Sequence, residues 1–340
     1  MPEDALLTPA AEAATGAGAG LLRGAAILAV GACLPERSVS NDEIAARIGK
    51  SDEWIYTRTG IRERRHALPE ERLTEIAATA SRAALERAGV DPAELDLVVV
   101  GTMTPDERMP NAAATIAQEL GALRAGSIEV NAACTGFLTA LSIGAAHVET
   151  GRAERVLVVG ADFISRITDQ DSKATAMLFA DGAGAVVVGP TAPGAGRIGP
   201  IRLRADASAP EVLYLAHGTD ATIEMDGHET FKHAVNRMSE VTREVIAAAG
   251  LRLEEIDLFV YHQANGRIIS AVGERLELPP ERVVDCIERI GNMSAATVPY
   301  ALATAEADGR LKDGARVLLS AFGGGFTWGG GVVEWGRGDA

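Results

Sequence analysis

The stretch AGVDPAELDLVVV (88–100) recurs in altered form as AGLRLEEIDLFVY (249–261), at an offset of 161 residues (249 − 88). Each copy starts where a helical pattern ends at a glycine and runs into a short apolar segment, which is typical of a strand buried on both faces. Two more pairs keep the same offset: NAACTGFLTAL (131–141) with NMSAATVPYAL (292–302), and RVLVV (155–159) with RVLLS (316–320). Several separated blocks with one offset indicate an internal duplication.

The alternation of helical and strand patterns predicts an α/β fold made of two duplicated halves, residues 23–196 and 197–340. Residues 1–22, rich in Ala and Gly, are predicted to be a flexible extension. In open parallel sheets, ligands bind at the carboxyl ends of strands. The loops after 127–130 and 257–261 are therefore expected to converge if the halves pack face to face.

Composition and charge exclude several classes of protein. The chain is 47% apolar and 23% charged, which allows a large core, and its net charge of −15 argues against nucleic-acid binding. The three cysteines lie far apart without a CxxC pair, so a disulfide framework and a thiolate zinc site are not expected. No basic signal peptide and no apolar run of about 18 residues is present. We expect a cytoplasmic protein that binds no membrane, metal or cofactor.

Cys134 is the first candidate for chemistry because it stands between the strand 127–130 and the helical segment 135–151. Unpaired N–H groups and the positive dipole end at a helix N-terminus stabilise an anion. The sequence therefore predicts a lowered thiol pKa and a nucleophilic thiolate. A buried structural cysteine is the common alternative, and it is the interpretation we give to Cys33 and Cys286.

His262 and Asn292 follow strand ends in the second half, in YHQANGR and IGNMSAAT. Alone, the first is more often a core histidine and the second a turn residue or helix cap. The case for a functional role of His262 and Asn292 depends on both residues lying opposite the Cys134 loop. A further strand end, AFGGGFTWGGG (321–331), has backbone N–H groups that can approach an oxyanion, or it is a tight turn. His228 and His233 lack the spacing of a helical zinc pair.

Taken together, these segments resemble β-ketoacyl-acyl carrier protein synthase III, the initiating condensing enzyme of bacterial fatty-acid synthesis in the thiolase superfamily. The resemblance covers about residues 24–336. It rests on these motifs: WIYTRTGIRERR (54–65), AACTGF (132–137), FADGAGA (179–185), YHQAN (261–265), GNMSAAT (291–297) and AFGGGFTWG (321–329). It implies a layered αβαβα fold, and the partners acyl-CoA, malonyl-acyl carrier protein and a second copy of the chain.

The resemblance also implies catalytic roles. Cys134 matches the nucleophile that takes the acyl group as a thioester, and His262 with Asn292 matches the pair that supports decarboxylation of the malonyl group. The backbone N–H groups of Cys134 and Gly324 match an oxyanion hole. Phe322 matches a phenylalanine beside the carboxylate that leaves. Two positioned donors near a developing enolate lower the barrier to decarboxylation, whatever the family.

Binding residues follow in the same way. Trp54 matches the ring that stacks on the adenine of CoA, and Arg58 and Arg267 match phosphate contacts. The candidates for a basic surface that attracts the acidic carrier protein are Arg62, Arg64, Arg65, Lys232, Arg267 and Arg275.

The chain departs from the family pattern at three positions. Lys173 stands where the family usually has an arginine against the adenine, and His228 where Asn is usual beside the pantetheine arm. Met109 replaces an aromatic residue that crosses the dimer interface and limits the acyl pocket. These changes concern the acyl donor and leave Cys134, His262 and Asn292 intact.

Alternative functions remain open at this point. Elongating condensing enzymes have a second histidine where Asn292 stands, and biosynthetic thiolases have a second cysteine before the glycine-rich loop. A homologue that primes a polyketide pathway, or that transfers an acyl group without condensation, is the main enzymatic alternative. A non-catalytic partner of the carrier protein is the alternative from another class.

Overall fold

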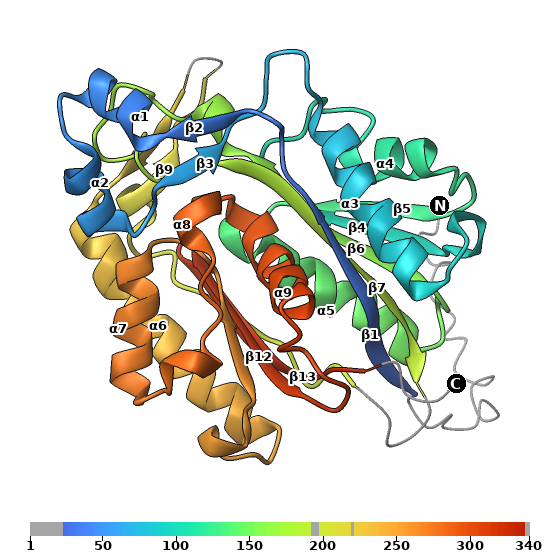
Figure 1. Ribbon diagram of the computed structural model, residues 1–340. Helices are drawn as coiled ribbons and strands as arrows, with labels where there is room; N and C mark the ends of the chain where they lie inside the picture. Colours follow the sequence, from blue (N-terminus) through green and yellow to red (C-terminus); the bar gives the residue numbers. More distant parts are fainter. Residues whose placement is uncertain (1–22, 192–196, 219–220, 337–340) are drawn as a thin grey trace, which may run out of the picture.

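Layers of helices and sheets alternate through the protein, in the order helix, sheet, helix, sheet, helix (Figure 1). The computed structural model describes residues 23–191, 197–218 and 221–336. The predicted extension, residues 1–22, lies outside the described residues. The predicted boundary at 196/197 adjoins 192–196, which also lie outside them, and it stays a prediction.

The first half forms a mixed sheet. Among the described residues its strand order is β1 (Gly24–Cys33), β7 (Asp181–Thr191), β6 (Val156–Phe163), β4 (Leu97–Gly101) and β5 (Gly126–Val130). β4 pairs in parallel with β5 and β6, whereas β7 is antiparallel to β1 and β6. The expectation of an open parallel sheet is therefore correct only for the β5–β4–β6 part, whose strands are joined by helical crossovers.

The second half repeats most of this sheet. Its strands, within the described part of the chain, run in the order β11 (Leu258–Tyr261), β12 (Arg316–Gly323), β13 (Thr327–Glu334) and β8 (Arg202–Ala205). β11 and β12 are parallel and the other pairs are antiparallel. Beside β11, on the side away from β12, there is only a single parallel bridge among the described residues, between Phe259 of β11 and Val283.

Helices cover both sheets and fill the space between them (Figure 1). The first sheet is covered on its outer side by α3 (Leu73–Ala88) and α4 (Ala112–Leu120), and the second by α6 (Gly227–Ala248), which packs against α7 (Gly266–Leu276). The central layer is α5 (Gly136–Glu149) and α9 (Thr297–Ala307). Both central helices are rich in small and apolar residues, as burial between two sheets requires.

Shorter elements close one end of the layers. They are β2 (Ser38–Ser40), α1 (Asn41–Ile48), α2 (Asp52–Thr59), β3 (Glu63–Arg65), the hairpin of β9 (Leu213–Leu215) and β10 (Ile223–Met225), and α8 (Ile287–Ile290). The side chains of Ser40 and Ser51 cap α1 and α2 by accepting from backbone N–H groups of the first turn.

The duplication is visible at the level of single turns. Short 3₁₀ helices η2 (Ala133–Thr135) and η7 (Ser294–Ala296) precede α5 and α9 at the same offset of 161 residues (294 − 133). Ala133 has φ +46° and Ser294 has φ +48°, so both turns begin with a non-glycine residue in the left-handed region. The predicted fold class, a layered α/β fold built from two duplicated halves, is confirmed.

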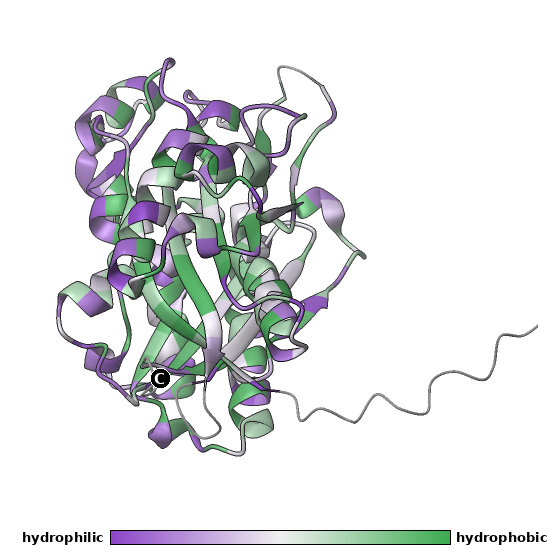
Figure 2. Cartoon of the chain, turned by 90° about the vertical axis from the view of Figure 1, so that its right-hand side faces the viewer, coloured by the Kyte–Doolittle hydropathy of each residue, from purple (hydrophilic) through white to green (hydrophobic). Residues whose placement is uncertain are grey.

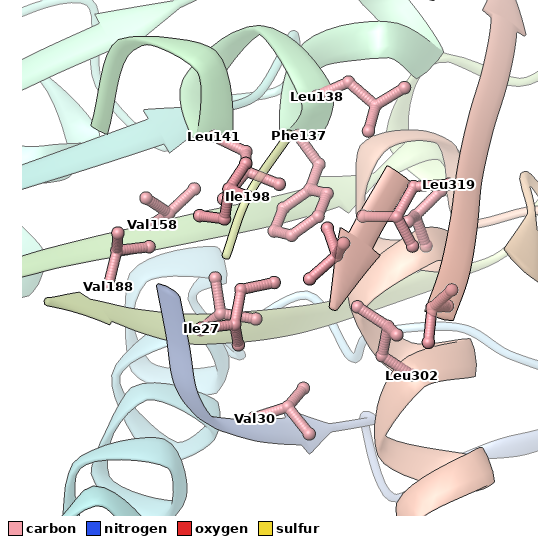
Figure 3. Close-up of a cluster of buried hydrophobic side chains, with 14 of the residues drawn as sticks. Ile27, Val30, Phe137, Leu138, Leu141, Val158, Val188, Ile198, Leu302 and Leu319 are labelled. Atoms are coloured by element: carbon pink, nitrogen blue, oxygen red, sulfur yellow. The ribbon is translucent and has the colours of Figure 1, made fainter. Parts of the chain in front are cut away.

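The main hydrophobic core lies between the two sheets, around the central helices (Figure 3). Phe137, Leu138 and Leu141 of α5 meet strand residues of both halves. Figure 2 shows hydrophobic residues along the strands and hydrophilic residues on the outer helices. Among the described residues, no helix is both long and apolar enough to cross a membrane.

At the centre of the molecule, backbone packs directly on backbone. A Cβ built on Gly160 of β6 would lie 2.3 Å from the carbonyl oxygen of Ala295, and one on Gly101 of β4 would lie 2.4 Å from the carbonyl carbon of Gly136. Real Cβ atoms do not approach this closely. These glycines therefore allow the start of α5 to pack on the end of β4, and η7, the turn before α9, to pack on β6.

We predict that Gly160→Ala lowers the free energy of unfolding by about 1–3 kcal/mol or more. The added methyl group would clash with the backbone of Ala295, which cannot move aside as a flexible side chain can. Gly273→Ala is the matched control: it lies inside α7 with no atom within 4 Å of the added Cβ. We expect it to be neutral or stabilising by up to about 1 kcal/mol. Urea unfolding midpoints measure both. Wild-type stability of Gly160→Ala would contradict the close central contact.

Candidate active site

A cavity of about 860 Å³ is lined by residues of both halves. It is mostly apolar, with a few polar groups, as small-molecule sites usually are. The sequence-predicted site residues that line it are Arg58, Cys134, His228, His262, Arg267, Asn292, Phe322 and Gly324. The structure thus brings the cysteine of the first half together with the histidine and asparagine of the second.

Cys134 lies in η2, directly before α5, and is 8% exposed. Gly323 at the end of β12 packs against it, since a Cβ on that glycine would lie 2.7 Å from Cys134 N. The turn is held by Thr135, whose hydroxyl donates to the carbonyl of Ala132 at 2.6 Å. The thiol is therefore placed by backbone contacts from both halves.

The predicted lowering of the Cys134 pKa is wrong. Burial raises the pKa of the thiol to about 12, and the negative charge of Asp162 adds to this, against a lowering by the Ser294 hydroxyl. The prediction considered the helix terminus alone and left out loss of solvent around the sulfur. Burial of the sulfur therefore favours the neutral thiol over the thiolate.

His262 follows β11 and is 1% exposed. Its Nδ1 lies 2.5 Å from Thr297 Oγ1, in the first turn of α9. Burial lowers the pKa of His262 to about 3, so the ring is neutral at physiological pH. With Nδ1 engaged, Nε2 is the ring nitrogen left for the cavity.

Asn292 is held from both sides. Its backbone N–H donates to Leu178 at 2.9 Å, and its carbonyl accepts from Ala180 at 2.9 Å. Its side-chain Oδ1 accepts from the backbone N–H of Ser294 at 2.9 Å, and Nδ2 donates to the carbonyl of Ala264 at 3.4 Å. The amide oxygen is therefore occupied, and Nδ2 retains one N–H for a substrate oxygen.

The glycine-rich strand end also reaches the cavity. Gly324 and Phe322 both line it, and the Phe322 ring packs on Phe326 with ring centroids 4.9 Å apart. Phe322 is 4% exposed. An aromatic ring that lines the same cavity as the thiol is a poor environment for a carboxylate.

The residues expected to bind CoA lie at and around the cavity. Arg58 stacks on Trp54, with Cζ 4.3 Å from the ring centroid, and Arg267 lies 5.5 Å from the Phe231 ring centroid. Trp54 and Lys173 are not among the lining residues, although Ala174 is. Lys173 is exposed. His228 lies at the start of α6, where its backbone N–H donates to the capping Asp226.

The residues predicted to form a basic surface differ in exposure, and their contact with the carrier protein stays a prediction. Lys232, Arg267 and Arg275 are exposed on α6 and α7. Arg64, in contrast, is fully buried and cannot contact a partner. Its guanidinium donates to Asn41 Oδ1 at 2.8 Å and to the carbonyl of Met177 at 2.9 Å, so it ties the α1 region to the 174–179 segment. Sequence alone could not show that Arg64 is a buried structural residue and not a surface charge.

Three further polar residues surround the site, and the sequence analysis did not single them out. They are Asp162, Ser294 and Thr297, each fully buried. An acidic residue inside the apolar strand VLVVGADF (156–163) was a visible signal for Asp162. Ser294 is the repeat counterpart of Ala133, the residue before the cysteine, and this position was a signal as well.

A duplicated α/β layered fold with a cysteine at the start of the central helix, facing a histidine and an asparagine, defines a thiolase-like condensing enzyme. Comparison with known proteins agrees. Residues 128–207 match the family 3-oxoacyl-[acyl-carrier-protein (ACP)] synthase III, and residues 246–335 match the C-terminal region of the same family.

Similar proteins cover nearly the whole chain. Beta-ketoacyl-[acyl-carrier-protein] synthase III of Brucella melitensis is 45% identical over 316 residues, 90% of this chain and 98% of the relative. The Geobacillus kaustophilus protein of that description is 41% identical over 314 residues, with 92% and 100% covered.

Solved structures show the same likeness. 3-oxoacyl-[acyl-carrier-protein] synthase III from Aquifex aeolicus superposes with a TM-score of 0.88 at 41% identity, with 92% of this chain and 100% of that chain covered. The priming beta-ketosynthase from the R1128 polyketide pathway gives 0.90 at 39%, with 94% and 98% covered. The chain belongs to the β-ketoacyl-[acyl-carrier-protein] synthase III family, and the prediction of that family and of an acyltransferase is confirmed.

We predict that acetyl-CoA acylates Cys134 alone. Intact-mass analysis should show one acetyl adduct, which is lost in Cys134→Ala. Cys286→Ala is the matched control and should keep the adduct, since burial also raises the pKa of Cys286 to about 12 but this thiol does not line the cavity. An adduct that survives Cys134→Ala would disprove the assignment of the nucleophile.

Proposed function

We propose that Cys134, His262 and Asn292 carry out the reaction of the family, the decarboxylative condensation of a short acyl-CoA with malonyl-acyl carrier protein that initiates fatty-acid synthesis. The products are 3-oxoacyl-acyl carrier protein, CO₂ and CoA. One observation carries the assignment: these three side chains come from distant parts of the sequence and line one cavity.

In the first half-reaction, the Cys134 sulfur attacks the thioester carbonyl of the acyl-CoA. The carbonyl oxygen becomes negative, and the backbone N–H groups of Cys134 and Gly324 are the donors that stabilise it. The packing of Gly323 against Cys134 N supports this pairing, because it brings the two backbone segments together. CoA departs as its thiol, taking up a proton in place of the one that Cys134 loses, and the acyl group remains as a thioester on Cys134.

In the second half-reaction, loss of CO₂ from the malonyl group places negative charge on its thioester oxygen. Asn292 Nδ2 and His262 Nε2 are the donors for this enolate, which requires the tautomer with hydrogen on Nε2. The Thr297 hydroxyl has two acceptors within reach, the carbonyl of Ser294 at 3.0 Å and His262 Nδ1 at 2.5 Å, and the required tautomer is the one in which it donates to Nδ1. The Phe322 ring disfavours the carboxylate before CO₂ leaves. The enolate carbon then attacks the acyl thioester and releases Cys134.

Both substrates react in the cavity that Cys134, His262 and Asn292 line. Arg58 and Arg267 bind the phosphates of CoA, and Trp54 stacks on its adenine. Lys173 lies against the adenine from the other side, and His228 lies beside the pantetheine arm. Lys232, Arg267 and Arg275 offer positive charge for the acidic carrier protein, on a chain whose net charge is −15.

A homodimer is part of the proposal. β5 is an edge strand within the described sheet, and Met109 and Leu123 nearby in the chain are 87% and 78% exposed. An unpaired strand edge with large exposed apolar side chains is suited to pair with a second copy. Met109 does not line the cavity of its own chain, so it reaches an acyl pocket only across such an interface. A cytoplasmic location agrees with the three free cysteines.

We predict that substitutions of His262 and Asn292 impair condensation far more than acylation. His262→Ala and Asn292→Ala should still form acyl-enzyme but lose malonyl decarboxylation by about 10²-fold or more, the usual cost of an oxyanion donor. The measurements are acyl-enzyme by mass and release of CO₂ from malonyl-acyl carrier protein. If Asn292→Ala decarboxylates at the wild-type rate, the enolate role is wrong.

We further predict that Met109 sets the primer length. Methionine is flexible and swings aside more easily than an aromatic ring, and each methylene buried gains up to about 0.8 kcal/mol. Butyryl-CoA or a branched short donor should therefore be accepted. Met109→Phe should shift preference toward acetyl-CoA, and Met109→Ala toward longer chains. The measurement is the ratio of kcat/KM for butyryl- and acetyl-CoA, and the same ratio in all three proteins would assign the pocket wall to another residue.

A further inference from the structure

A short segment, residues 177–180, runs beside Asn292 and holds its backbone. Phe179 forms a parallel bridge with Asn292. In this bridge the Asn292 N–H donates to the carbonyl of Leu178, and the Ala180 N–H donates to the carbonyl of Asn292, both at 2.9 Å. The groups that bind the other side of the segment therefore also determine where Asn292 lies.

Two side chains from β3 and the residue after it bind that other side. Arg64 Nη2 donates to the carbonyl of Met177 at 2.9 Å. His66 Nε2 lies 3.2 Å from the carbonyl oxygen of Phe179, and since a carbonyl can only accept, the hydrogen is on Nε2. Arg64 and His66 are two residues apart, so their side chains lie on one face of the strand. The segment is held between this face and Asn292.

These two side chains are fixed by burial. Arg64 is fully buried, and His66 is 6% exposed. The Arg64 guanidinium also donates to Asn41 Oδ1 at 2.8 Å and to the carbonyl of Val39 at 3.3 Å. Burial lowers the pKa of His66 to about 4, so the ring is neutral and its one N–H is committed to Phe179. Water cannot replace either donor unless the segment moves, because the acceptors lie in the interior.

Arg64 also contacts the Asn292 turn directly. Gly291, the residue before Asn292, has φ +65°. A Cβ built on it would lie 3.0 Å from the Cβ atoms of both Arg64 and Ala180, and 3.1 Å from the carbonyl oxygen of Leu178. The turn therefore fits against the same two parts of the chain, the β3 side chain and the segment 177–180.

The cysteine is held by different contacts. In the turn that carries Cys134, the Thr135 hydroxyl donates to the carbonyl of Ala132 at 2.6 Å and lies 3.1 Å from Thr327 Oγ1. These partners belong neither to β3 nor to the segment 177–180. A displacement of Asn292 should therefore leave Cys134 in place.

We propose that Arg64 and His66 are positioning residues for Asn292. By fixing the segment 177–180 they fix the Asn292 backbone, and so aim Nδ2 at the oxygen on which the enolate charge develops. A displacement of about 1 Å in an active site can cost about 10²-fold in rate. This inference rests on the enolate role of Asn292 proposed above, and it gives neither Arg64 nor His66 a contact with substrate.

His66→Leu is the main test, because leucine fills a similar volume without a donor. We expect release of CO₂ from malonyl-acyl carrier protein, measured on preformed acetyl-enzyme, to fall about 10-fold, as for the loss of one buried hydrogen bond. Acetylation of Cys134 by acetyl-CoA, followed by intact mass, should stay within about twofold of wild type, since its contacts are independent. His66→Gln, whose amide nitrogen lies near the position of Nε2, should restore most of the decarboxylation.

Arg64→Lys is the second variant. Lysine keeps the charge, but its single nitrogen cannot reach Met177 and Asn41 together. It should also lose more decarboxylation than acylation, and the same two rates measured on it decide the question where His66→Leu does not fold. His147→Leu is the matched control, since it removes another histidine–carbonyl contact, 2.9 Å to Ile143 within α5. It should leave both rates within about twofold of wild type.

Combination with Asn292→Ala separates this inference from the enolate role. Adding His66→Leu to Asn292→Ala should cause less than about twofold further loss of decarboxylation, because the histidine acts through the asparagine. Wild-type decarboxylation by Asn292→Ala would refute the enolate role itself. With that role intact, three results would each overturn the positioning role: wild-type decarboxylation by His66→Leu, equal losses of acylation and decarboxylation, or a full further loss in the double variant.

Discussion

The structure depends on the contact between the first turns of α5 and α9 at the centre of the molecule. A Cβ on Gly160 would lie 2.3 Å from the carbonyl oxygen of Ala295, so the backbone of the first half touches that of the second. Gly101 leaves no room for a Cβ against Gly136, so β4 packs equally closely on the start of α5. Ala295 sits against Gly160 and donates its N–H to Asp162. This contact fixes the position of the turn that carries Cys134 relative to the turn that carries Asn292. Both residues line the same cavity.

Burial then sets the chemistry. The same close packing that aligns the turns removes water from Cys134, Asp162 and His262, and each neutral form is favoured as a result. Loss of water therefore disfavours a thiolate–imidazolium pair at this site. In the mechanism that we propose, the backbone N–H of Cys134 and Asn292 Nδ2 are fixed donors for the negative charge that develops on the substrates, which is an efficient arrangement in a site without water.

Much of this organisation could be predicted from the sequence, because the offset of 161 residues is preserved in the structure down to the φ angles of Ala133 and Ser294. Cys134, His262 and Asn292 stood out as polar residues at strand ends. The sheet directions, the burial of Arg64 and the high pKa of Cys134 could not be predicted. Each depends on packing between segments far apart in the chain, such as Arg64 against Met177. Ser294 and Asp162 also escaped notice, since a serine in a turn and an acid in a strand have no distinctive spacing.

The central claim is that the two halves build one acylation site around Cys134. A crystal structure of the protein after reaction with acetyl-CoA tests it most directly. The account predicts an acetyl group on Cys134 Sγ whose carbonyl oxygen accepts from the N–H groups of Cys134 and Gly324, with His262 and Asn292 facing the acetyl carbon. An acetyl group on another residue, or a carbonyl oxygen bound by His262 and Asn292 instead, would contradict it.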